Sequence, residues 1–374
     1  MVYKSNRILR LNICFNLLLC GSFLGSGCQT KAKQSAALDD QTAGNPRGMV
    51  DERYPTGAVV ISTVDSFRPL LSFQDQLLAN LPPDVSAYLI LPFGNPFAQR
   101  HQASFDSGRF QALEMPNKSN WTRDYFPEVV VGQDGSAKLV QFQYQHQDGQ
   151  HARAIGERFA SLLGLPLVTS NLILEGGNLM VDSTTRVLFV TEKIISANAS
   201  LTQGQIEAEL KSVLEVDYVE WLPVLPKETT GHIDIFAKIV ANATVIVSDS
   251  LNPNRKPMLD QVARRFEEIG YRVSRVLNAE EAQDNARTKS YTNSLLVNNI
   301  AFVPSYYWPD YHEDGITPPE EGQRARAADA AAKEAYQMAG YQVVQIPTLT
   351  MTDFGGAIHC LTKQIWNGVP RLHQ

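Results

Sequence analysis

The sequence predicts an α/β domain built from five copies of one unit, in the order strand, strand, helix and strand, arranged in a ring. Three observations lead to this prediction. The chain has 374 residues, more than the roughly 250–300 residues that one hydrophobic core usually supports. An amphipathic helix pattern followed by a short apolar strand recurs after residue 53. The first and last strand-like runs of the domain each lack a partner beside them in the sequence.

The repeated helices are amphipathic and of ordinary length, and each ends at a turn before an apolar strand. They are expected near residues 66–80, 151–164, 202–215, 254–270 and 322–340. The strands that follow them are expected at residues 88–91, 165–168, 218–222, 271–276 and 341–346. Two further strand-like runs joined by a tight turn, such as 241–244 or 298–299, lie before a helix. Because each unit buries its faces against its neighbours, the repetition accounts for a domain of this size.

The two ends of the domain are expected to complete one sheet. The run Gly355–Trp366 has no partner strand after it, and the run Thr56–Val64 has none before it. Pairing of these two runs would close the ring and remove exposed sheet edges. The alternative is two separate domains divided near residue 200.

The start of the chain has the pattern of a secretory signal. Lys4, Arg7 and Arg10 precede an apolar stretch within residues 17–24 that is too short to span a membrane. Small residues then lead to Cys28, as at a bacterial lipoprotein cleavage site. We expect a signal peptide at residues 1–27 and lipid attachment at Cys28. An ordinary cleaved signal with an incidental cysteine is the alternative.

The rest of the chain divides into a tether and a domain. Residues 28–52 are polar, without apolar periodicity, and are expected to form a flexible tether, whereas residues 53–374 form the catalytic domain. Since no run of eighteen or more apolar residues occurs, only the lipid would attach the protein to a membrane. The expected location is the cell envelope, as an exported lipoprotein that faces the periplasm or lies in the outer membrane.

Charge and cysteine content narrow the classes of function. The 39 acidic and 33 basic residues give a net charge of −6, so nucleic acid is not expected as the main partner. Three of the four cysteines, Cys14, Cys20 and Cys28, fall in the signal or at its end. Cys360 is therefore the one thiol of the mature domain, and it is either a buried small hydrophobic residue or a reactive group.

Several polar residues occupy matching places near the start of the interior hairpins. They are Asp124, Glu175, His232 with Asp234, Asn293 and Cys360. If the units surround one axis, equivalent positions meet at that axis. A carboxylate in a buried centre needs a partner, and several carboxylates together require a cation.

Each of these residues also has an ordinary explanation. His232 and Asp234 are two apart in an expected strand, so both would point to one face, opposite Ile233; a core histidine beside a surface aspartate is the alternative. Glu175 precedes two glycines that permit close approach, although a glutamate at a turn is common. Asp124 follows an arginine, with which it would pair at the surface. Trp121 is a candidate aromatic wall.

Together these residues describe a site for a planar cation. A guanidinium has five N–H donors in a fixed fork that matches carboxylates, and Asp124, Asp234 and in addition Glu175 could hold it. Its carbon is a poor electrophile, so attack requires a strong nucleophile, for which the thiolate of Cys360 is suited. His232 would protonate the departing ammonia and then deprotonate the hydrolytic water.

Two other kinds of site use the same residue types. Zinc sites contain cysteine, histidine and carboxylates, but they favour clustered spacing and more cysteine or histidine than this chain offers. A Cys–His–Glu peptidase has the same nucleophile and base. His359 is a second candidate base, but in an expected strand it would point away from the side chain of Cys360.

Five motifs in this order resemble those of agmatine deiminases and of the Porphyromonas-type peptidylarginine deiminases, which are guanidino-group-modifying enzymes. The motifs are Trp121–Asp124, Leu174–Asn178, Thr230–Asp234, Tyr291–Asn293 and Gly355–Cys360. The resemblance covers about residues 53–370 and implies a five-bladed α/β propeller of ββαβ repeats, the pentein fold. It also implies an enzyme that needs no metal and no organic cofactor.

The resemblance implies roles for the matched residues. The catalytic residues are Cys360, His232 and Glu175, and the substrate-binding residues are Asp124, Asp234, Trp121 and Asn293. The expected activity is cysteine-dependent hydrolysis of agmatine or an arginine-type guanidinium to a ureido group plus ammonia, through a covalent amidino-thioester. The alternatives are protein citrullination on an arginine peptide, a non-catalytic guanidine-binding envelope lipoprotein, and amidino transfer to an amine. Residues 144–148 contain no arginine to hold a substrate carboxylate, which argues against peptidylarginine.

Overall fold

A computed structural model describes residues 44–64, 68–95, 97–145, 149–279, 288–309, 319–352 and 355–372 of the chain. The described strands form five sheets. Each sheet combines an antiparallel pair of strands with a parallel strand that is reached through a helix. The expected α/β class and the expected unit of strand, strand, helix and strand are therefore confirmed.

The first sheet is formed by both ends of the domain. Its spatial order is β17 (Thr362–Trp366), β2 (Thr56–Ser62), β3 (Ser86–Leu91) and β4 (Phe110–Glu114), and helices α2 (Arg68–Asn80), α3 (Phe97–Arg100) and α4 (Gln102–Asp106) connect its parallel strands. β17 lies antiparallel to β2, with Thr362 opposite Ile61. The predicted pairing of the two end runs is confirmed, and it joins the last unit to the first.

The other four sheets follow the chain in order. The second contains β1 (Gly48–Met49), β5 (Glu128–Val131), β6 (Ala137–Gln143) and β7 (Leu167–Ile173), with helix α6 (Gly149–Leu163). The third contains β8 (Met180–Asp182), β9 (Val187–Thr191) and β10 (Tyr218–Leu222), with helices α7 (Lys193–Ala197) and α8 (Gln203–Leu214). The fourth contains β11 (Ala237–Ala241), β12 (Thr244–Asp249) and β13 (Arg272–Leu277), with helix α9 (Lys256–Glu268). The fifth contains β14 (Leu295–Val297), β15 (Ile300–Ser305) and β16 (Gln342–Pro347), with helix α11 (Pro319–Met338).

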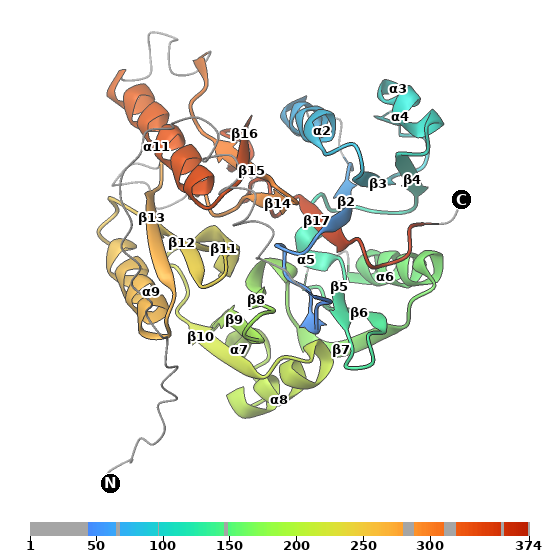
Figure 1. The fold of residues 1–374 in the computed structure, drawn as a ribbon, viewed down its shortest axis with the longest axis horizontal. Coiled ribbons are helices and arrows are strands. Elements are labelled where there is room, and N and C mark those ends of the chain that lie inside the picture. The colour runs from blue at the N-terminus through green and yellow to red at the C-terminus, as the bar shows by residue number, and fades with distance from the viewer. Residues whose placement is uncertain are drawn as a thin grey trace, which may run out of the picture.

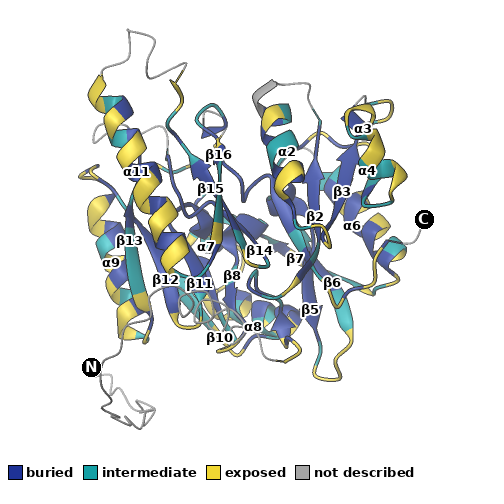
Figure 2. Cartoon of the chain, turned by 45° about the horizontal axis from the view of Figure 1, so that its top comes forward, coloured by how far each residue is buried: buried dark blue, intermediate teal, exposed yellow. Residues whose placement is uncertain are grey.

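The helices surround the strands. Figure 1 shows α2, α6, α8, α9 and α11 on the outside of the molecule, with the sheets between them and the centre. In Figure 2 the strands are largely buried, whereas the outer faces of these helices are exposed. This arrangement is compatible with the five-bladed propeller, in which the inner ends of all units meet.

Local sequence explains where the helices lie. Thr202 and Gln205 form a reciprocal capping box at the start of α8, which satisfies backbone N–H groups that have no partner within the helix. In α9 the apolar side chains recur at helical spacing, and Leu259, Val262 and Phe266 are fully buried against β12. Each helix thus covers its own sheet.

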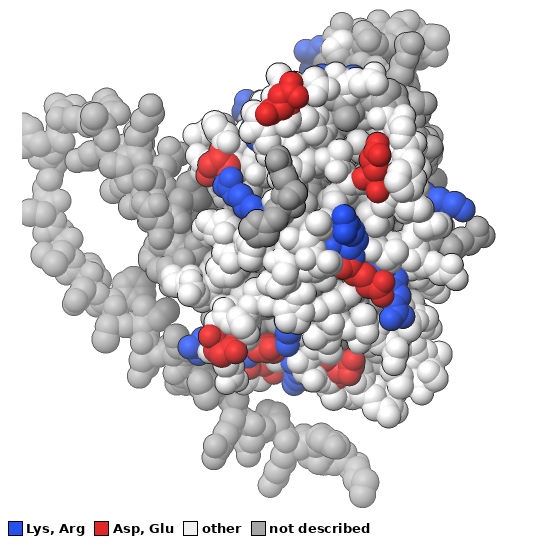
Figure 3. Space-filling model, turned by 90° about the vertical axis from the view of Figure 1, so that its right-hand side faces the viewer, with Lys and Arg blue, Asp and Glu red and all other residues white. Residues whose placement is uncertain are grey.

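The outer surface carries charges of both signs. On the face shown in Figure 3, acidic and basic side chains are interspersed and separated by uncharged surface. Among the described residues, no helix combines the length and the apolar character that crossing a bilayer requires.

The alternative of two domains divided near residue 200 is wrong. β9 and β10 pair in parallel, with Val187 opposite Tyr218. Residue 200 lies in the crossover between these two strands, inside a single unit. A domain boundary there would divide one sheet.

The predicted tether ends too late in the sequence. β1 pairs with β5, Asp51 and Arg53 are buried, and Arg53 donates to Asp51 Oδ2 at 2.6 Å. Residues 48–52 therefore belong to the folded domain rather than to a flexible tether. The predicted signal peptide at 1–27 and the lipidated Cys28 lie outside the described residues.

Two expected strand positions are also corrected. Residues 233–235 form a short 3₁₀ turn, η2 (Ile233–Ile235), and β11 begins only at Ala237, so His232 and Asp234 do not share a strand face. Cys360 lies in a turn before β17 rather than in a strand. Strand alternation therefore cannot be the reason why the His359 side chain points away from the thiol. The ring of His359 lies instead between Asp234 and Glu52.

Candidate active site

A cavity of about 330 Å³ contains most of the predicted site residues. It is lined by Trp121, Asp124, Gln145, Glu175, Lys193, Thr229, Thr230, His232, Gly355 and Cys360. The lining residues come from four of the five units, so the site depends on the whole assembly of units. The structure thus brings together Trp121, Asp124, Glu175, His232 and Cys360, while Asp234 and Asn293 lie buried beside the cysteine.

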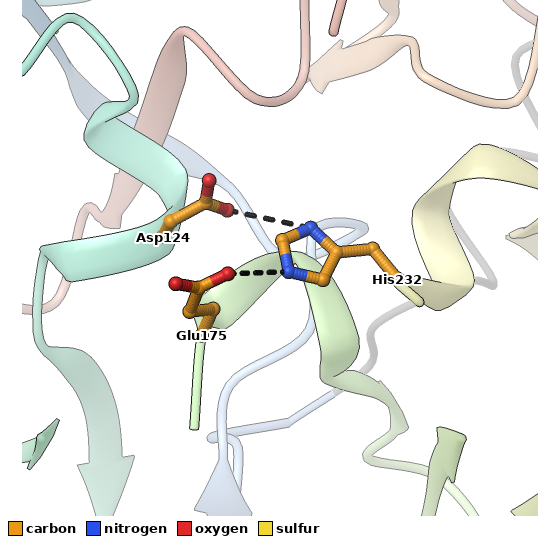
Figure 4. Close-up of side chains that lie close together, drawn as sticks. All are labelled: Asp124, Glu175 and His232. Atoms are coloured by element: carbon orange, nitrogen blue, oxygen red, sulfur yellow. Dashed lines mark hydrogen bonds and ion pairs between the residues drawn. The ribbon is translucent and has the colours of Figure 1, made fainter. Parts of the chain in front are cut away.

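Short turns place the acidic residues and the histidine. Asp124 lies in the single-turn helix α5 (Thr122–Tyr125), Glu175 precedes the 3₁₀ turn η1 (Gly176–Asn178), and His232 precedes η2. His232 Nε2 lies 2.9 Å from Glu175 Oε2, and His232 Nδ1 lies 3.6 Å from Asp124 Oδ1 (Figure 4). The imidazole is therefore held between two carboxylates, and it is 2% exposed.

Glycines allow these groups to come so close. A Cβ atom on Gly177 would lie 2.3 Å from His232 Nδ1 and 3.0 Å from Asp124 Oδ1. A Cβ atom on Gly356 would lie 2.6 Å from Trp121 Cζ3 and 2.9 Å from the Cys360 Cβ. Both positions exclude any side chain, which supports the expectation that the glycines after Glu175 permit close approach.

Asn293 holds the cysteine turn. Its Nδ2 donates to Cys360 Sγ at 3.0 Å, and its Oδ1 accepts from the backbone N–H of Ala357 at 3.0 Å and of Cys360 at 3.3 Å. Asn293 is 1% exposed and does not line the cavity. Its contacts position the thiol, and its expected contact with substrate stays a prediction.

Asp234 lies on the other side of the thiol. Its Oδ2 is 3.7 Å from Cys360 Sγ and 2.6 Å from His359 Nδ1. The other oxygen, Asp234 Oδ1, is buried and has no hydrogen-bond partner among the described residues; the same holds for Asp124 Oδ1 and His232 Nδ1. Buried carboxylate oxygens without donors are costly, so this cavity favours a ligand that brings N–H groups.

The charges of the site act on one another. Burial raises the pKa of Asp124, and Glu175 and Asp234 raise it further, although His232 opposes them. Burial alone would lower the pKa of His232, but Asp124 and Glu175 outweigh it and raise that pKa. Burial, followed by the charges of Asp234 and Asp124, raises the pKa of the Cys360 thiol. The thiol therefore needs additional positive charge nearby to ionise near neutral pH.

One described group of side chains could surround a metal ion. Ligand atoms of Asp124, Glu175 and His232 all lie within 4.8 Å of one another. The group offers two carboxylates and one imidazole, a poorer set for zinc than sites with more cysteine or histidine. Cys360 does not belong to this group, so an ion held there would not bind the sulfur.

Comparison with known proteins identifies the family. Residues 84–365 match the family model described as Porphyromonas-type peptidyl-arginine deiminase. The chain belongs to this family. Curated relatives include a putative agmatine deiminase of Vibrio parahaemolyticus, 25% identical over 329 residues that span 77% of this chain and 86% of the relative. An agmatine deiminase of Pseudomonas putida is 28% identical over 302 residues, which span 69% of this chain and 77% of the relative.

Solved structures show the same fold. The agmatine deiminase of C. jejuni with substrate bound superposes with a TM-score of 0.72 at 15% identity, covering 86% of this chain and 97% of that one. A putative arginine deiminase from Porphyromonas gingivalis superposes with a TM-score of 0.71 at 22% identity, covering 87% of this chain and 100% of that one. The predicted resemblance to the agmatine deiminase and peptidylarginine deiminase family is confirmed.

The cavity also contains a charged residue, Lys193, that the sequence did not predict for the site. Lys193 begins α7 directly after β9, and its aliphatic stem packs against Gly231, where a Cβ atom would lie 2.8 Å from Lys193 Cγ. Its Nζ lies 3.5 Å from the carbonyl oxygen of Thr229, at the distance limit of a hydrogen bond. A signal was present, because Lys193 closely follows the second strand of the hairpin that begins after Glu175. The equivalence of the hairpin starts does not extend to this position at the end of a hairpin.

Proposed function

We propose that the protein is a cysteine-dependent guanidine deiminase, which hydrolyses a guanidinium to a ureido group and ammonia. The observation that carries the proposal is that Cys360 shares its cavity with Asp124 and lies beside Asp234, and that each of these two carboxylates has a buried oxygen without a donor among the described residues. Asp234 Oδ2 lies 3.7 Å from the sulfur, and Asp234 Oδ1 and Asp124 Oδ1 are the oxygens without donors. The family and the agmatine deiminases among its relatives support the same activity.

The carboxylates bind the substrate. Asp124 and Asp234 accept N–H groups of the guanidinium, and the planar cation matches two carboxylates in fixed positions. Trp121 forms one wall of the cavity beside the sulfur, since it packs against Gly356. The bound cation offsets the negative charge near Cys360 and thereby favours its thiolate.

The reaction then proceeds in two halves. The thiolate attacks the guanidinium carbon, His232 gives a proton to one amino group, and the bond between carbon and that nitrogen breaks to release ammonia. Water then attacks the amidino carbon while His232 takes a proton from it. The carbon–sulfur bond breaks with sulfur leaving as thiolate, and the remaining hydroxyl proton passes to the released ammonia or to solvent, which leaves the neutral ureido product. Glu175, 2.9 Å from His232 Nε2, stabilises the protonated imidazole in both halves.

The rim of the cavity favours a substrate whose other end is anionic. Among the described lining residues Lys193 is the one lysine or arginine, and its Nζ donates to the carbonyl oxygen of Thr229 at 3.5 Å. Agmatine carries a second positive charge, which Lys193 would repel, whereas the carboxylate of an arginine-type substrate would pair with it. A unit charge pair at 4 Å is worth about 1 kcal/mol in water and about 4 kcal/mol at an effective dielectric constant of 20.

A substrate panel tests the function. Ammonia and ureido product are measured with agmatine, free arginine, a peptide ending in arginine and a peptide with internal arginine, for wild type and Cys360→Ala. We expect turnover by the wild type alone. Turnover by Cys360→Ala would overturn the mechanism. Binding of guanidines by the wild type without product would identify a guanidine-binding protein, and capture of the amidino carbon by an added amine would identify amidino transfer.

We also infer that the protein is an envelope lipoprotein. The motivation is the basic start of the chain, the short apolar stretch and Cys28 after small residues. Wild type and Cys28→Ala are compared by detergent partitioning of the full chain. Lipid attachment predicts that only the wild type enters the detergent phase, and equal partitioning would contradict it.

A further inference from the structure

A second cavity lies behind the cysteine turn and contains several buried charges. Its volume is about 60 Å³, and its lining includes Glu52, Arg123, Asp234, Lys238 and His359. These residues come from the segment after β1, from α5, from η2, from β11 and from the cysteine turn. Asp234 belongs both to this cluster and to the surroundings of the Cys360 sulfur.

The imidazole of His359 bridges two carboxylates in this cluster. Its Nδ1 lies 2.6 Å from Asp234 Oδ2, and its Nε2 is in hydrogen-bond contact with Glu52 Oε1. Glu52 is held in turn by Lys238 Nζ at 2.9 Å and by Arg123 Nη2 at 3.2 Å. His359, Asp234 and Lys238 are all buried. The result is a continuous chain from Glu52 through His359 and Asp234 to the sulfur.

The number of protons in this chain decides how many of its contacts are hydrogen bonds. A neutral imidazole donates one hydrogen bond, and an ionised carboxylate only accepts. Burial and the cations Arg123 and Lys238 lower the pKa of His359, yet both of its ring nitrogens face carboxylate oxygens. Both contacts are hydrogen bonds at the same time only when the Glu52–His359–Asp234 set holds two protons. Two ionised carboxylates flanking a neutral imidazole would place an oxygen against a nitrogen lone pair.

We propose that His359, anchored by Glu52, is a positioning residue that donates a hydrogen bond to Asp234 Oδ2 and so aims Asp234 Oδ1 at the substrate. Oδ2 is occupied by His359 and lies beside Cys360 Sγ, so the remaining oxygen is the one that lacks a partner among the described residues. Without His359, the Asp234 side chain could rotate, and the guanidinium would no longer be held in line with the sulfur. The catalytic part of this proposal rests on the proposed deiminase function.

The same region offers a matched control. Arg53 Nη2 pairs with Asp182 Oδ1 at 2.7 Å, and Tyr271 donates to Asp182 Oδ2 at 2.5 Å. Like the Glu52–His359 cluster, this group of Arg53, Asp182 and Tyr271 is buried and holds the segment after β1. No contact joins Asp182 to the cysteine turn or to Asp234 among the described residues. Asp182→Asn therefore disturbs a buried charge cluster without breaking the chain to the sulfur.

Kinetics test the positioning role with three variants. His359→Ala removes the donor to Asp234, and we expect kcat to fall by at least about tenfold, because a hydrogen bond to a charged group is lost. In His359→Asn the side-chain amide can occupy the place of Nδ1, so it restores most of the lost kcat. Asp182→Asn lowers the melting temperature but keeps the wild-type kcat. A His359→Ala enzyme with wild-type kcat, or His359→Asn as impaired as His359→Ala, would overturn the proposal.

Nuclear magnetic resonance of the ring protons gives a result that needs no turnover. The full chain is labelled with ¹⁵N-histidine, and the strongly hydrogen-bonded N–H protons of His359 are expected far downfield. These signals should vanish in His359→Asn and remain in Asp182→Asn. If no such signal depends on His359, the proton-sharing chain does not exist, whether or not the protein is a deiminase. If the signals are present and wild type turns over no guanidine, the proposed function fails while the chain stands.

Discussion

Replacement of Gly177 by alanine tests the geometry around His232. The added Cβ atom would lie 2.3 Å from His232 Nδ1, whereas ordinary contacts begin at 3.4 Å, so the imidazole must retreat by about 1 Å. His232 is buried, and its Nε2 lies 2.9 Å from Glu175, so such a shift breaks that bond. A misplacement of about 1 Å costs roughly a hundredfold in rate, and overpacking costs about 1–3 kcal/mol of stability.

The assay compares Gly177→Ala with Gly204→Ala. A Cβ atom on Gly204, in helix α8, would meet no atom within 4 Å, so this control adds the same methyl group in open space. We expect the control to keep the wild-type kcat and to gain about 0.5–1 kcal/mol in unfolding free energy, because alanine favours a helix. A Gly177→Ala enzyme with kcat within about threefold of wild type would refute the reasoning, since the loss expected for a shift of this size is far larger.

Three further predictions concern charge. Lys193→Met should lower the preference for free arginine over agmatine by about fivefold or more, from roughly 1 kcal/mol of charge interaction, as measured by the ratio of the two kcat/KM values. The rate should rise from pH 7 into the alkaline range, because burial raises the pKa of the Cys360 thiol. It should fall again above the pKa of His232, which the neighbouring carboxylates raise to about 10. A pH–rate profile that is flat or falls above pH 7 contradicts this prediction. Asp182→Asn should lower the free energy of unfolding by about 3 kcal/mol at pH 7. Although burial opposes this effect, Arg53 lowers the pKa of Asp182 in the folded protein. The stability that Asp182 contributes is therefore present above its unfolded pKa and is lost as the pH falls through its folded pKa. Chemical denaturation at several pH values should show the free energies of unfolding of the variant and wild type converging in acid.

Most of the fold could be predicted because its signals are local. The five long helices and the strands after them follow from periodicity, and their observed ends differ from the expected ones by a few residues. The pairing of β17 with β2 followed from a simple accounting of strands without partners. The wrong boundary at residue 52 has a different cause. Composition classifies a polar stretch as a whole, while a single buried pair such as Asp51 and Arg53 is enough to fold its end.

The site was predicted in part for a similar reason. Trp121, Asp124, Glu175, His232 and Cys360 were found because equivalent positions of repeated units meet. The spacing of His232 and Asp234 predicts a strand wrongly, since alternation with isoleucine is typical of a strand but occurs here in a 3₁₀ turn. Gly231 has a φ of +71°, and the chain turns immediately after it, which a polar–apolar pattern cannot indicate.

The buried charges behind the cysteine could not have been found from sequence. Lys238 and Lys363 lie in strands, where alternation assigns a lysine to the solvent face, yet both are 4% exposed. Burial lowers the pKa of Lys363 to about 8, and its contact with Glu128, 235 residues away, opposes that effect. His359 meets Glu52 across 307 residues. A buried charge is tolerated only with its partner, and the partners of these buried charges meet only when the ring of units closes. The position of Asp234 beside the sulfur therefore depends on residues that no local sequence pattern connects.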